Sequence, residues 1–535
     1  MENEEYNVDE ILPKGYKTYE KYLDDILEFL TPNEILFAHN IYNEEKELVY
    51  VEKSVHSLLN KEYEMLPKEF LNYFNNLEEY MKKNPNDAEA IYEFIMDLST
   101  DELPTIPSKN DKKKKELKEL FPLPKELINF IDISRKLTPN DKSDECKIKD
   151  PTTNEWYEVI IKGKPNPHIS TSLMRQKKKY EIKLLGDTII KEAKNKNINI
   201  IIDVGCGIGY LTNYISMNSN IRAIGIEGNE DNTNKMMLRI EMIEQKNNEN
   251  IKKAEGYTAF LTPEISPEEF KKIARINDEN VILTGLHPCG DLTPILMRLF
   301  KNLEQIKSLI FVSCCYNKLS ENPLYFKLNN DEIKNQSFKY GFPISDYLLI
   351  KNKIKFQLTN SYISSNPHPK SRTREDWFYA YKMRSYRNAL ELFIHNHLPN
   401  YLETHYIGQI RENSSNSFGD YLNRALNNIK RKAPKYKFHN EKYIIELTKW
   451  IENITSKNDI IKIGNEFYKS LNTFNEIIFE SAVIISLDAR ISQVLEGLMI
   501  ADRVLFLKQF CSYVSARRLF HPFISPRGIV IIAHK

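Results

Sequence analysis

The sequence lacks several features that would place it at once in a functional class. Its 75 Lys and Arg residues balance 74 Asp and Glu residues for a net charge of +1, so no global field attracts nucleic acid or acidic membranes. No uncharged apolar run reaches the roughly 18 residues that a membrane span needs. The first residues, MENEEYNVDE, lack the basic start and apolar run of a signal peptide. These absences predict an intracellular protein, cytoplasmic or nuclear, with no membrane partner.

Cysteine is scarce and scattered. The 6 cysteines lie far apart, except for the adjacent pair Cys314 and Cys315. This pattern does not match the disulfide framework of a small secreted module, and it indicates a reducing compartment. No internal repeat is present either.

The chain of 535 residues is long enough for several domains of roughly 100 to 200 residues each. Residues 1 to about 110 are predicted to be helical, because apolar side chains recur on one face at Tyr19, Leu23, Ile26, Leu27 and Leu30. The next stretch, DELPTIPSKNDKKKKELKEL, mixes prolines with a lysine run. It predicts a solvated linker or loop.

From about residue 165, short apolar runs alternate with helical patterns. Four runs predict strands at 198–204, 221–228, 281–287 and 308–315. They are nearly continuous in apolar or small residues, as strands covered on both faces must be. Strands that alternate with helices imply parallel crossovers, so the fold class is α/β with a doubly wound, Rossmann-like sheet.

Helical patterns return after about residue 345 and dominate to about 512. The chain then closes on SPRGIVIIAHK, a turn signal followed by a strand that is expected to rejoin the sheet. The predicted organisation is an N-terminal helical region (1–120), the α/β core (121–345), a large helical insertion (346–512) and a C-terminal strand region (513–535).

The segment IIDVGCGIGYLTNYI, residues 201–215, predicts a strand, a glycine loop and the start of a helix. Such a turn presents backbone N–H groups and the positive helix end to a ligand. The spacing is Gly205, Gly207 and Gly209. No Gly-Lys-Ser/Thr follows, as a phosphate-cradling loop requires, and Tyr210 stands where a dinucleotide fingerprint needs its third glycine.

Two carboxylates flank this loop. Asp203 would repel a pyrophosphate, but it suits the ammonium and sulfonium groups of S-adenosylmethionine. Glu227 ends the next strand and can accept hydrogen bonds from both ribose hydroxyls. The pattern therefore predicts an S-adenosylmethionine site, and a tight turn without a ligand is the alternative.

The loops after two later strands, LHPCGDLTP and SCCYNK, are expected at the same sheet edge, where doubly wound folds bind ligands. Thr293 is predicted to cap a helix, with Pro294 in its first position. The loop LHPCGDLTP lacks the Asn/Asp-Pro-Pro-Tyr/Phe motif, so methylation of an exocyclic base amine is not indicated. The candidate catalytic residues here are His287, Cys289, Asp291 and Cys314, together with Cys315 beside them.

Three interpretations of these residues stay open. The cysteines are small apolar packing residues, or His287 or Asp291 acts as general base and orienting group, or a cysteine is a nucleophile or zinc ligand. The adjacent Cys314 and Cys315 do not closely match a metal spacing. No metal is therefore predicted.

The chain also resembles the methyltransferase-like protein 25 family, which includes the ribosomal RNA adenine dimethylase domain-containing proteins. The resemblance runs in order from about residue 120 to the C-terminus through DVGCGIGYLT, IGIEGNE, TGLHPCGDLT, VSCCYNKLS, GFPISDYL, VLEGLMIADRVLFLKQ and LFHPFISPRGIVIIAHK. It implies a class I S-adenosylmethionine-dependent methyltransferase whose sheet is interrupted by a helical insertion.

The segment RQKKKYEI is similar to the Lys-Lys-x-His-Glu segment of that family, which implies that Lys177, Lys178 and Glu181 lie near the cofactor. Tyr180 replaces the histidine. The cofactor-binding residues predicted from the loop and the resemblance together are Lys178, Glu181, Asp203, Gly205, Gly207, Gly209, Tyr210, Glu227 and His287.

The leading functional hypothesis is an intracellular methyltransferase that acts on RNA (rRNA or tRNA) or on a ribosome-associated substrate. Three basic stretches with interleaved aromatics, RQKKKYEIK, IKRKAPKYK and SARRLFHP, could follow a phosphate backbone or stack unpaired bases. The alternative for each stretch is a solvated face. The alternative functions are a protein methyltransferase and a non-catalytic scaffold that keeps the fold.

Overall fold

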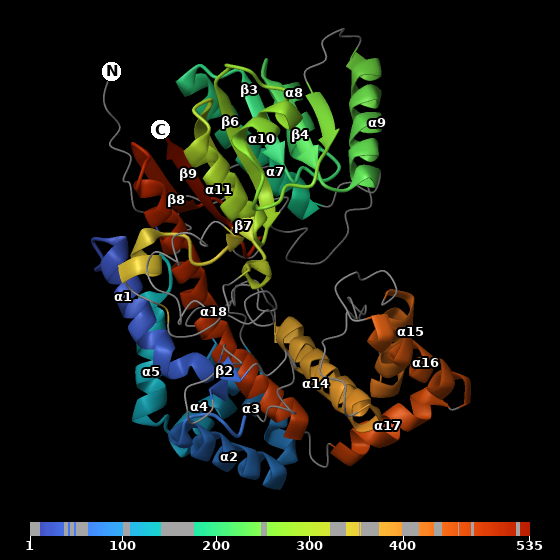
Figure 1. Ribbon diagram of the computed structural model, residues 1–535. Coiled ribbons are helices and arrows are strands. Elements are labelled where there is room, and N and C mark those ends of the chain that lie inside the picture. Colours follow the sequence, from blue (N-terminus) through green and yellow to red (C-terminus); the bar gives the residue numbers. More distant parts are fainter. Residues whose placement is uncertain are drawn as a thin grey trace. The chain divides into compact units, whose positions relative to one another are not determined.

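A computed structural model describes residues 11–36, 41–42, 48–49, 63–99, 108–140, 176–247, 254–320, 339–351, 354, 374–398, 417–432, 441–457, 459–471, 476–520 and 525–535. The chain forms two compact units (Figure 1). The sheet unit comprises Met1–Asn33, Ile133–Ser371 and Ile491–Lys535, and the helical unit comprises Glu34–Asp132 and Arg372–Arg490. The domain limits placed at residues 120, 345 and 512 stay a prediction.

The sheet unit is built on a 7-stranded sheet with the order β5-β4-β3-β6-β7-β9-β8. Its strands are β3 (Ile200–Val204), β4 (Arg222–Glu227), β5 (Ala254–Thr258), β6 (Val281–Cys289), β7 (Ile306–Cys314), β8 (Tyr513–Arg518) and β9 (Ile529–His534). Strand β9 runs antiparallel to both of its neighbours, and the other neighbouring pairs are parallel. The doubly wound sheet and the return of the last strand are as predicted.

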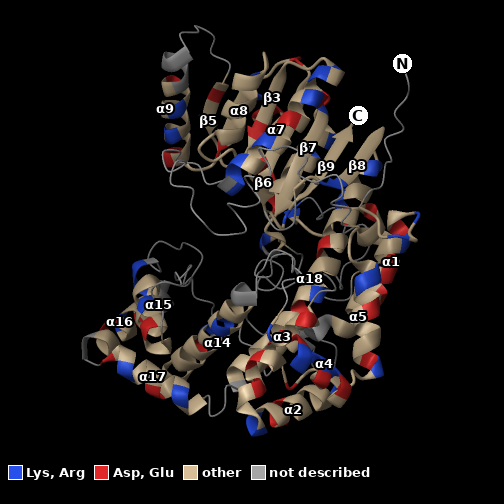
Figure 2. Cartoon of the chain, turned by 180° about the vertical axis from the view of Figure 1, so that it is seen from behind, with Lys and Arg blue, Asp and Glu red and all other residues tan. Residues whose placement is uncertain are grey.

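Helices cover both faces of this sheet. Helices α7 (Gln176–Lys196) and α8 (Tyr210–Asn218) pack on one face, where Leu185 and Ile189 share an apolar cluster with Ile282 and Ile310 of the central strands. Helix α11 (Leu292–Asn302) packs against β6 and β7. It lies in front of the sheet in Figure 1, whereas α7 is in front in the reverse view of Figure 2. Helices α9 (Glu230–Asn247) and α10 (Pro267–Ala274) complete the crossovers.

The parallel register brings four strand ends to one edge of the sheet. Val204 of β3 pairs with Ile226 of β4, one residue before Glu227, and the last partners of β6 and β7 are Cys289 and Cys314. A register shift between Leu286 and Cys289 precedes that last pair. The glycine loop, Glu227 and the two cysteine loops therefore leave the sheet at the same edge, which is where doubly wound folds bind ligands.

Three further helices have residues in the sheet unit. Helix α1 (Tyr19–Leu30) buries the predicted face at Tyr19, Leu23, Ile26 and Leu30, and the Thr18 side chain caps it by accepting from the Lys21 amide. Helix α5 (Lys125–Leu137) and the long α18 (Glu476–Lys508) follow, and the boundary between the units falls within each of these two helices.

The helical unit contains α2 (Lys68–Lys83), α3 (Ala88–Asp97), α4 (Asp111–Leu120), α14 (Arg374–His397), α15 (Phe418–Lys432), α16 (Glu441–Lys457) and α17 (Ile460–Leu471). Strands β1 (Ile41–Tyr42) and β2 (Leu48–Val49) pair antiparallel. Helices α14 to α17 share one apolar core, which includes Phe393, Phe418, Leu422 and Ile451. Acidic and basic residues are interspersed along helices such as α2 and α9 (Figure 2).

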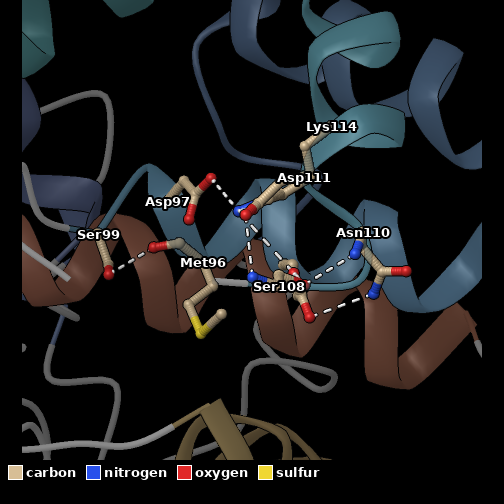
Figure 3. A network of polar contacts seen from close by, with 8 residues as sticks. Met96, Asp97, Ser99, Ser108, Asn110, Asp111 and Lys114 are labelled. Atoms are coloured by element: carbon tan, nitrogen blue, oxygen red, sulfur yellow. Dashed lines mark hydrogen bonds and ion pairs between the residues drawn. The ribbon is translucent and has the colours of Figure 1, made fainter. Parts of the chain in front are cut away.

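The lysine run does not form the predicted solvated linker. Residues 111–120 form helix α4, and Lys114 is only 8% exposed (Figure 3). Its Nζ lies 3.0 Å from Asp97 Oδ2 and 3.8 Å from Glu93 Oε2 on α3, and 3.3 Å from Asp111 Oδ1. Ion pairing to acidic residues compensates the buried ammonium, so this part of the prediction was wrong. Residues 101–107 of the same stretch lie outside the described residues.

Among the helices that the structure describes, none is both long enough and apolar enough to cross a membrane.

Candidate functional site

The glycine loop between β3 and α8 has the backbone that its sequence predicts. Gly205, Gly207 and Gly209 have φ angles of 71°, 58° and 74°, in the left-handed region that favours glycine. A Cβ added to Gly207 would meet no atom within 4 Å, whereas one added to Gly209 would collide with Met236 of α9. Gly209 therefore lets the loop pack closely, and Gly207 leaves the loop backbone open to a ligand.

Asp203 lies buried at the end of β3 beside this open backbone. The residue is 1% exposed, and its Oδ2 accepts a hydrogen bond of 2.8 Å from Thr212 Oγ1. Its other oxygen, Oδ1, has no hydrogen-bond partner among the described residues. Burial raises the pKa of Asp203 to about 6, although the bond from Thr212 and the charge of Lys178 act the other way. The carboxylate therefore lacks a positive partner on one side.

Glu227, at the end of β4, is held toward the same loop. Its Oε2 accepts from the Gly207 amide at 2.8 Å, and its Oε1 accepts from the Asn229 amide at 3.0 Å. Each carboxylate oxygen keeps a further lone pair for a ligand hydroxyl. The predicted position of Glu227 beside the glycine loop is thus the position that the structure gives it.

A third group, the half-buried His287, lies near the end of β6. His287 Nε2 lies 3.1 Å from Glu181 Oε1 of α7, and Ser525 Oγ donates to the same oxygen at 2.7 Å. Burial alone raises the pKa of Glu181, but the hydrogen bonds from His287 and Ser525 outweigh it and lower the pKa to about 2. Glu181 is therefore a carboxylate that can only accept, so His287 Nε2 carries the proton in this pair.

The other imidazole nitrogen of His287, Nδ1, has no hydrogen-bond partner in the described part of the chain. The residue has a φ angle of 63°, a conformation that side-chain-bearing residues rarely adopt. Nδ1 is itself buried, so it can take a proton only from a substrate hydroxyl or amine that is brought into contact with it.

Lys177 and Lys178 lie on the first turn of α7, next to Glu181. Their ammonium groups are 3.8 Å and 3.9 Å from the Glu181 carboxylate oxygens. Burial lowers the pKa of Lys178, while the charges of Glu181 and Asp203 raise it. The charge of Lys178 therefore interacts with the carboxylates of both Glu181 and Asp203. It also interacts with Cys314.

Cys289, Cys314 and Cys315 converge as the sequence predicts. The Sγ atoms of Cys289 and Cys314 are 3.3 Å apart, and those of Cys314 and Cys315 are 3.4 Å apart. All three thiols are free. Side-chain hydrogen bonds with Cys289 and Cys314 lower the pKa of the Cys315 thiol, whereas those with Cys289 and Cys315 raise the pKa of Cys314.

The structure corrects the predicted loop at Asp291 and Thr293. Strand β6 continues to Cys289, and α11 begins at Leu292 with Asp291 in the cap position. Thr293 does not cap the helix, because its hydroxyl donates to the Pro288 carbonyl at 2.7 Å. Asp291 Oδ1 accepts from the Ser320 amide at 2.8 Å. Asp291 therefore orders the following loop, and the group that orients His287 is Glu181.

Tyr210, another predicted cofactor residue, is the first residue of α8 and packs against the apolar cluster beneath α7. Its ring lies 3.9 Å from the Arg239 guanidinium carbon. This cation–π contact ties α8 to α9, and whether Tyr210 also touches a cofactor stays a prediction.

Sequence reasoning missed the charged residues that support the SCCYNK loop. Arg503 of α18 donates to Ser313 Oγ at 2.8 Å, and the guanidinium carbons of Arg503 and Arg527 lie 4.9 Å and 5.3 Å from the centroid of the buried Tyr316 ring. Arg527 in turn pairs with Glu496 at 3.2 Å. The sequence did contain a signal for these contacts, because Glu496 and Arg503 lie in a largely apolar helix. Charged side chains are costly to bury without partners.

A neighbouring contact explains two more of the motifs. Asp502 of α18 accepts from the amides of Ile344 and Ser345, at 3.0 Å and 2.9 Å. It thereby joins the motif VLEGLMIADRVLFLKQ to the motif GFPISDYL.

Part of the chain is similar in sequence to known methyltransferases. Residues 177–322 match the family model described as a methyltransferase domain. A human protein, probable methyltransferase-like protein 25, is 34% identical over 91 residues, which are 17% of this chain and 14% of the human protein. The mouse protein of the same name is 37% identical over 70 residues, 13% of this chain and 11% of its own length.

Residues 177–322 thus match a methyltransferase domain, and over the aligned segments the chain is similar to methyltransferase-like protein 25. The aligned segments span less than a sixth of the length of the curated relatives. S-adenosylmethionine is the cofactor of this domain class. The residues present fit it, because Gly207 leaves the loop open and Asp203 Oδ1 has no hydrogen-bond partner within the described part of the chain.

Solved methyltransferases were also found by comparison of folds. Magnesium protoporphyrin IX methyltransferase from Synechocystis PCC 6803 is 13% identical, with a TM-score of 0.19, 36% of this chain covered and 78% of that chain. Coclaurine N-methyltransferase is 13% identical, with a TM-score of 0.22, 83% of this chain covered and 100% of that chain. The fold assignment rests on the strand order of the 7-stranded sheet.

Proposed function

We propose that this chain transfers a methyl group from S-adenosylmethionine to a nucleophile on RNA or on a ribosome-associated substrate. The observation that carries the transfer is the buried Oδ1 of Asp203, which has no hydrogen-bond partner among the described residues, next to the open backbone of Gly207. A cation placed there would pair with Asp203 Oδ1 and offset the desolvation of that carboxylate.

When bound, S-adenosylmethionine supplies an electrophilic methyl group on its sulfonium. Each protein group then has one task. Gly207 would permit close approach of the ligand, Glu227 would accept from its hydroxyls, and Asp203 would balance its positive charge. On the acceptor side, His287 Nδ1 would take the proton of the attacking hydroxyl or amine, with Glu181 as the positioning residue that holds the imidazole.

The charge around the acceptor side supports a polyanionic substrate. The side chains of Lys177 and Lys178 are 48% and 36% exposed, and Lys318 in the turn after the cysteines is exposed as well. Lysines around one edge of the sheet attract a phosphate backbone even though the whole chain carries a net charge of only +1.

The other basic stretches contribute less to this proposal. Lys430 pairs with Glu452 at 3.1 Å, and Arg518 is buried and donates to the Pro526 carbonyl. Residues 433–437 of IKRKAPKYK and residues 521–522 of SARRLFHP lie outside the described part of the chain.

The test uses purified full-length protein, S-adenosylmethionine labelled in its methyl group, and cell extract. We expect protein-dependent label that ribonuclease removes and protease does not. Label removed by protease alone would support a protein substrate and contradict RNA. Calorimetry with S-adenosylmethionine separates the third case, because a scaffold that has lost the cofactor would show no heat of binding.

A further inference from the structure

Cys289, Cys314 and Cys315 form a compact group that has no task in the proposed methyl transfer, in which His287 is the base. We refer to these three residues as the thiol cluster. Their sulfur atoms all lie within 4.8 Å of one another, and the two closest pairs are 3.3 Å and 3.4 Å apart. Tetrahedral zinc with Zn–S bonds of about 2.3 Å places its sulfur ligands about 3.8 Å apart. The two close pairs need to widen by about 0.4–0.5 Å, and the third pair, within 4.8 Å, needs to close by at most about 1 Å, to give a zinc-sized set of three ligands.

Strand pairing, rather than sequence spacing, builds the cluster. Cys289 and Cys314 are register partners at the ends of the parallel strands β6 and β7, just after the register shift that follows Leu286. Cys315 is the next residue, and its φ angle of 52° turns the chain sharply at the end of β7. Two adjacent cysteines do not form a usual metal motif, but with a partner on the neighbouring strand they supply three sulfurs on one side.

The cluster is closed on one side and open on the other. Cys314 is buried, Cys315 is half-buried and Cys289 is exposed. Zinc sites with three protein ligands keep their fourth position for water or substrate, whereas purely structural sites supply four ligands. The exposed side at Cys289 provides that fourth position.

The surrounding charges balance a metal–thiolate group. Three thiolates and one divalent ion carry a net charge of −1. The charge of Lys318 acts on Cys289 and Cys315, and that of Lys178 acts on Cys314. These two lysine charges would offset the excess negative charge, which a purely apolar surrounding could not do.

We propose that Cys289, Cys314 and Cys315 bind one zinc ion, with the fourth position open at the acceptor edge of the sheet. Thiolate ligands favour zinc over the hard ions magnesium and calcium. This site goes beyond methyl transfer and does not rest on it, because the three ligands stand whether or not His287 acts as a base. The proposed zinc site also differs from the prediction made from the sequence, which was that no metal is bound.

The experiment measures metal binding directly on the full-length chain. Reduced protein is loaded with zinc, passed over a desalting column and analysed for metal and protein. We expect one zinc ion per chain. Cadmium is then titrated into the metal-free protein, and sulfur-to-cadmium charge-transfer absorption reports thiolate ligation.

Variants assign the ligands. Cys289→Ser, at the exposed position, should weaken zinc binding by more than the roughly 10–100-fold that loss of a residue supporting a metal ligand costs. Cys511→Ser is the matched control, because Cys511 is half-buried like Cys315 and lies outside the cluster. It should keep both the zinc content and the cadmium absorption of the unsubstituted protein.

A second measurement needs no variant, so a folding defect cannot obscure the result. Alkylation of the native protein with iodoacetamide, with and without zinc, is mapped by mass spectrometry. Zinc should protect Cys289 and Cys315 and leave the modification of Cys511 unchanged. The proposal is overturned if the reduced protein retains no zinc and shows no protection. A Cys289–Cys314 disulfide that forms in place of zinc binding, under the same conditions, would also overturn it.

Discussion

Glu181 Oε1 lies 3.1 Å from His287 Nε2, although 106 residues separate the two in the sequence. Ser525, near the C-terminus, donates to the same carboxylate oxygen. Helix α7, the end of β6 and the C-terminal segment therefore meet at one carboxylate. This contact decides which nitrogen of the imidazole carries a proton, and so which nitrogen can serve an acceptor.

The first prediction concerns the contact between Glu181 and His287, which fixes the tautomer of the imidazole. Glu181→Gln can donate a proton as well as accept one, so His287 is no longer held in one tautomer. We expect the rate of methyl transfer to fall by about 100-fold or more at saturating S-adenosylmethionine, with little change in the affinity for the cofactor. Single-turnover kinetics with labelled cofactor measure the rate, and calorimetry measures the affinity.

Glu192→Gln is the matched control for this prediction. Glu192 lies on the same helix and also pairs with a histidine, since its Oε2 is 3.3 Å from His534 Nε2, but that pair is not at the acceptor edge. Methyl transfer should be unaffected in Glu192→Gln. Equal losses in the two variants would mean that α7 has only been destabilised.

The second prediction concerns pH and Asp203. Its pKa is raised from 3.8 to about 6 in the folded protein, so the folded state holds the proton more tightly than the unfolded state. The stability contributed by the protonated form is therefore present below about pH 4 and is lost as pH rises through about 6. Asp203→Asn removes this dependence.

We expect Asp203→Asn to raise the free energy of unfolding at about pH 8 by about 2 kcal/mol in the absence of cofactor, and to change it much less at about pH 4. Urea unfolding at both pH values tests this. The same variant should bind S-adenosylmethionine more weakly, because the amide cannot balance a positive charge. Destabilisation of equal size at both pH values would show that Asp203 contributes through its hydrogen bond from Thr212 alone.

The third prediction concerns a substitution that fills the space beside the glycine loop. Gly207→Val should abolish detectable binding of S-adenosylmethionine, because a side chain there occupies the position where ligand and backbone meet. Gly15→Val is the control, since Gly15 also has a positive φ angle, of 105°, and open space around its Cβ position. Both variants should lose some stability, but only Gly207→Val should lose the cofactor. Retained affinity in Gly207→Val contradicts the site.

The fourth prediction concerns the support beneath the cysteine loop. Arg503→Met removes the donor to Ser313 Oγ and the cation over Tyr316, and both partners are buried. We expect a loss of about 2–4 kcal/mol in the free energy of unfolding. Lys508→Met, at the exposed end of the same helix, should cost less than about 1 kcal/mol. Similar values for the two would mean that Arg503 is dispensable to the loop.

The sequence predicted the buried centre of the fold better than its edges. The four central strands and the closing strand are apolar runs, and each was predicted within a few residues. Strands β5 (AEGYT) and β8 (YVSARR) were missed, because edge strands are short and carry polar residues that interrupt the apolar signal. Helix α4 was predicted as a linker because its ion-pair partners on α3 are distant in sequence.

The residues of the candidate site also fall into two groups, those that sequence spacing could predict and those that it could not. The glycine loop, Asp203 and Glu227 lie within one crossover, so their spacing carries the information. Ser525, Arg503 and the contact between Glu181 and His287 come from segments far apart, and spacing alone could not reveal them. The resemblance placed Glu181 near the cofactor, and the structure adds that its carboxylate is bound to His287.

The most direct test of the central claim is a crystal structure of the protein with S-adenosylhomocysteine, the product of methyl transfer. We expect the ribose hydroxyls on Glu227 and the ammonium group on the side of Asp203, with the ligand against the backbone of Gly207. A ligand bound away from this loop, or a loop whose own side chains fill the space beside Gly207, would contradict the account.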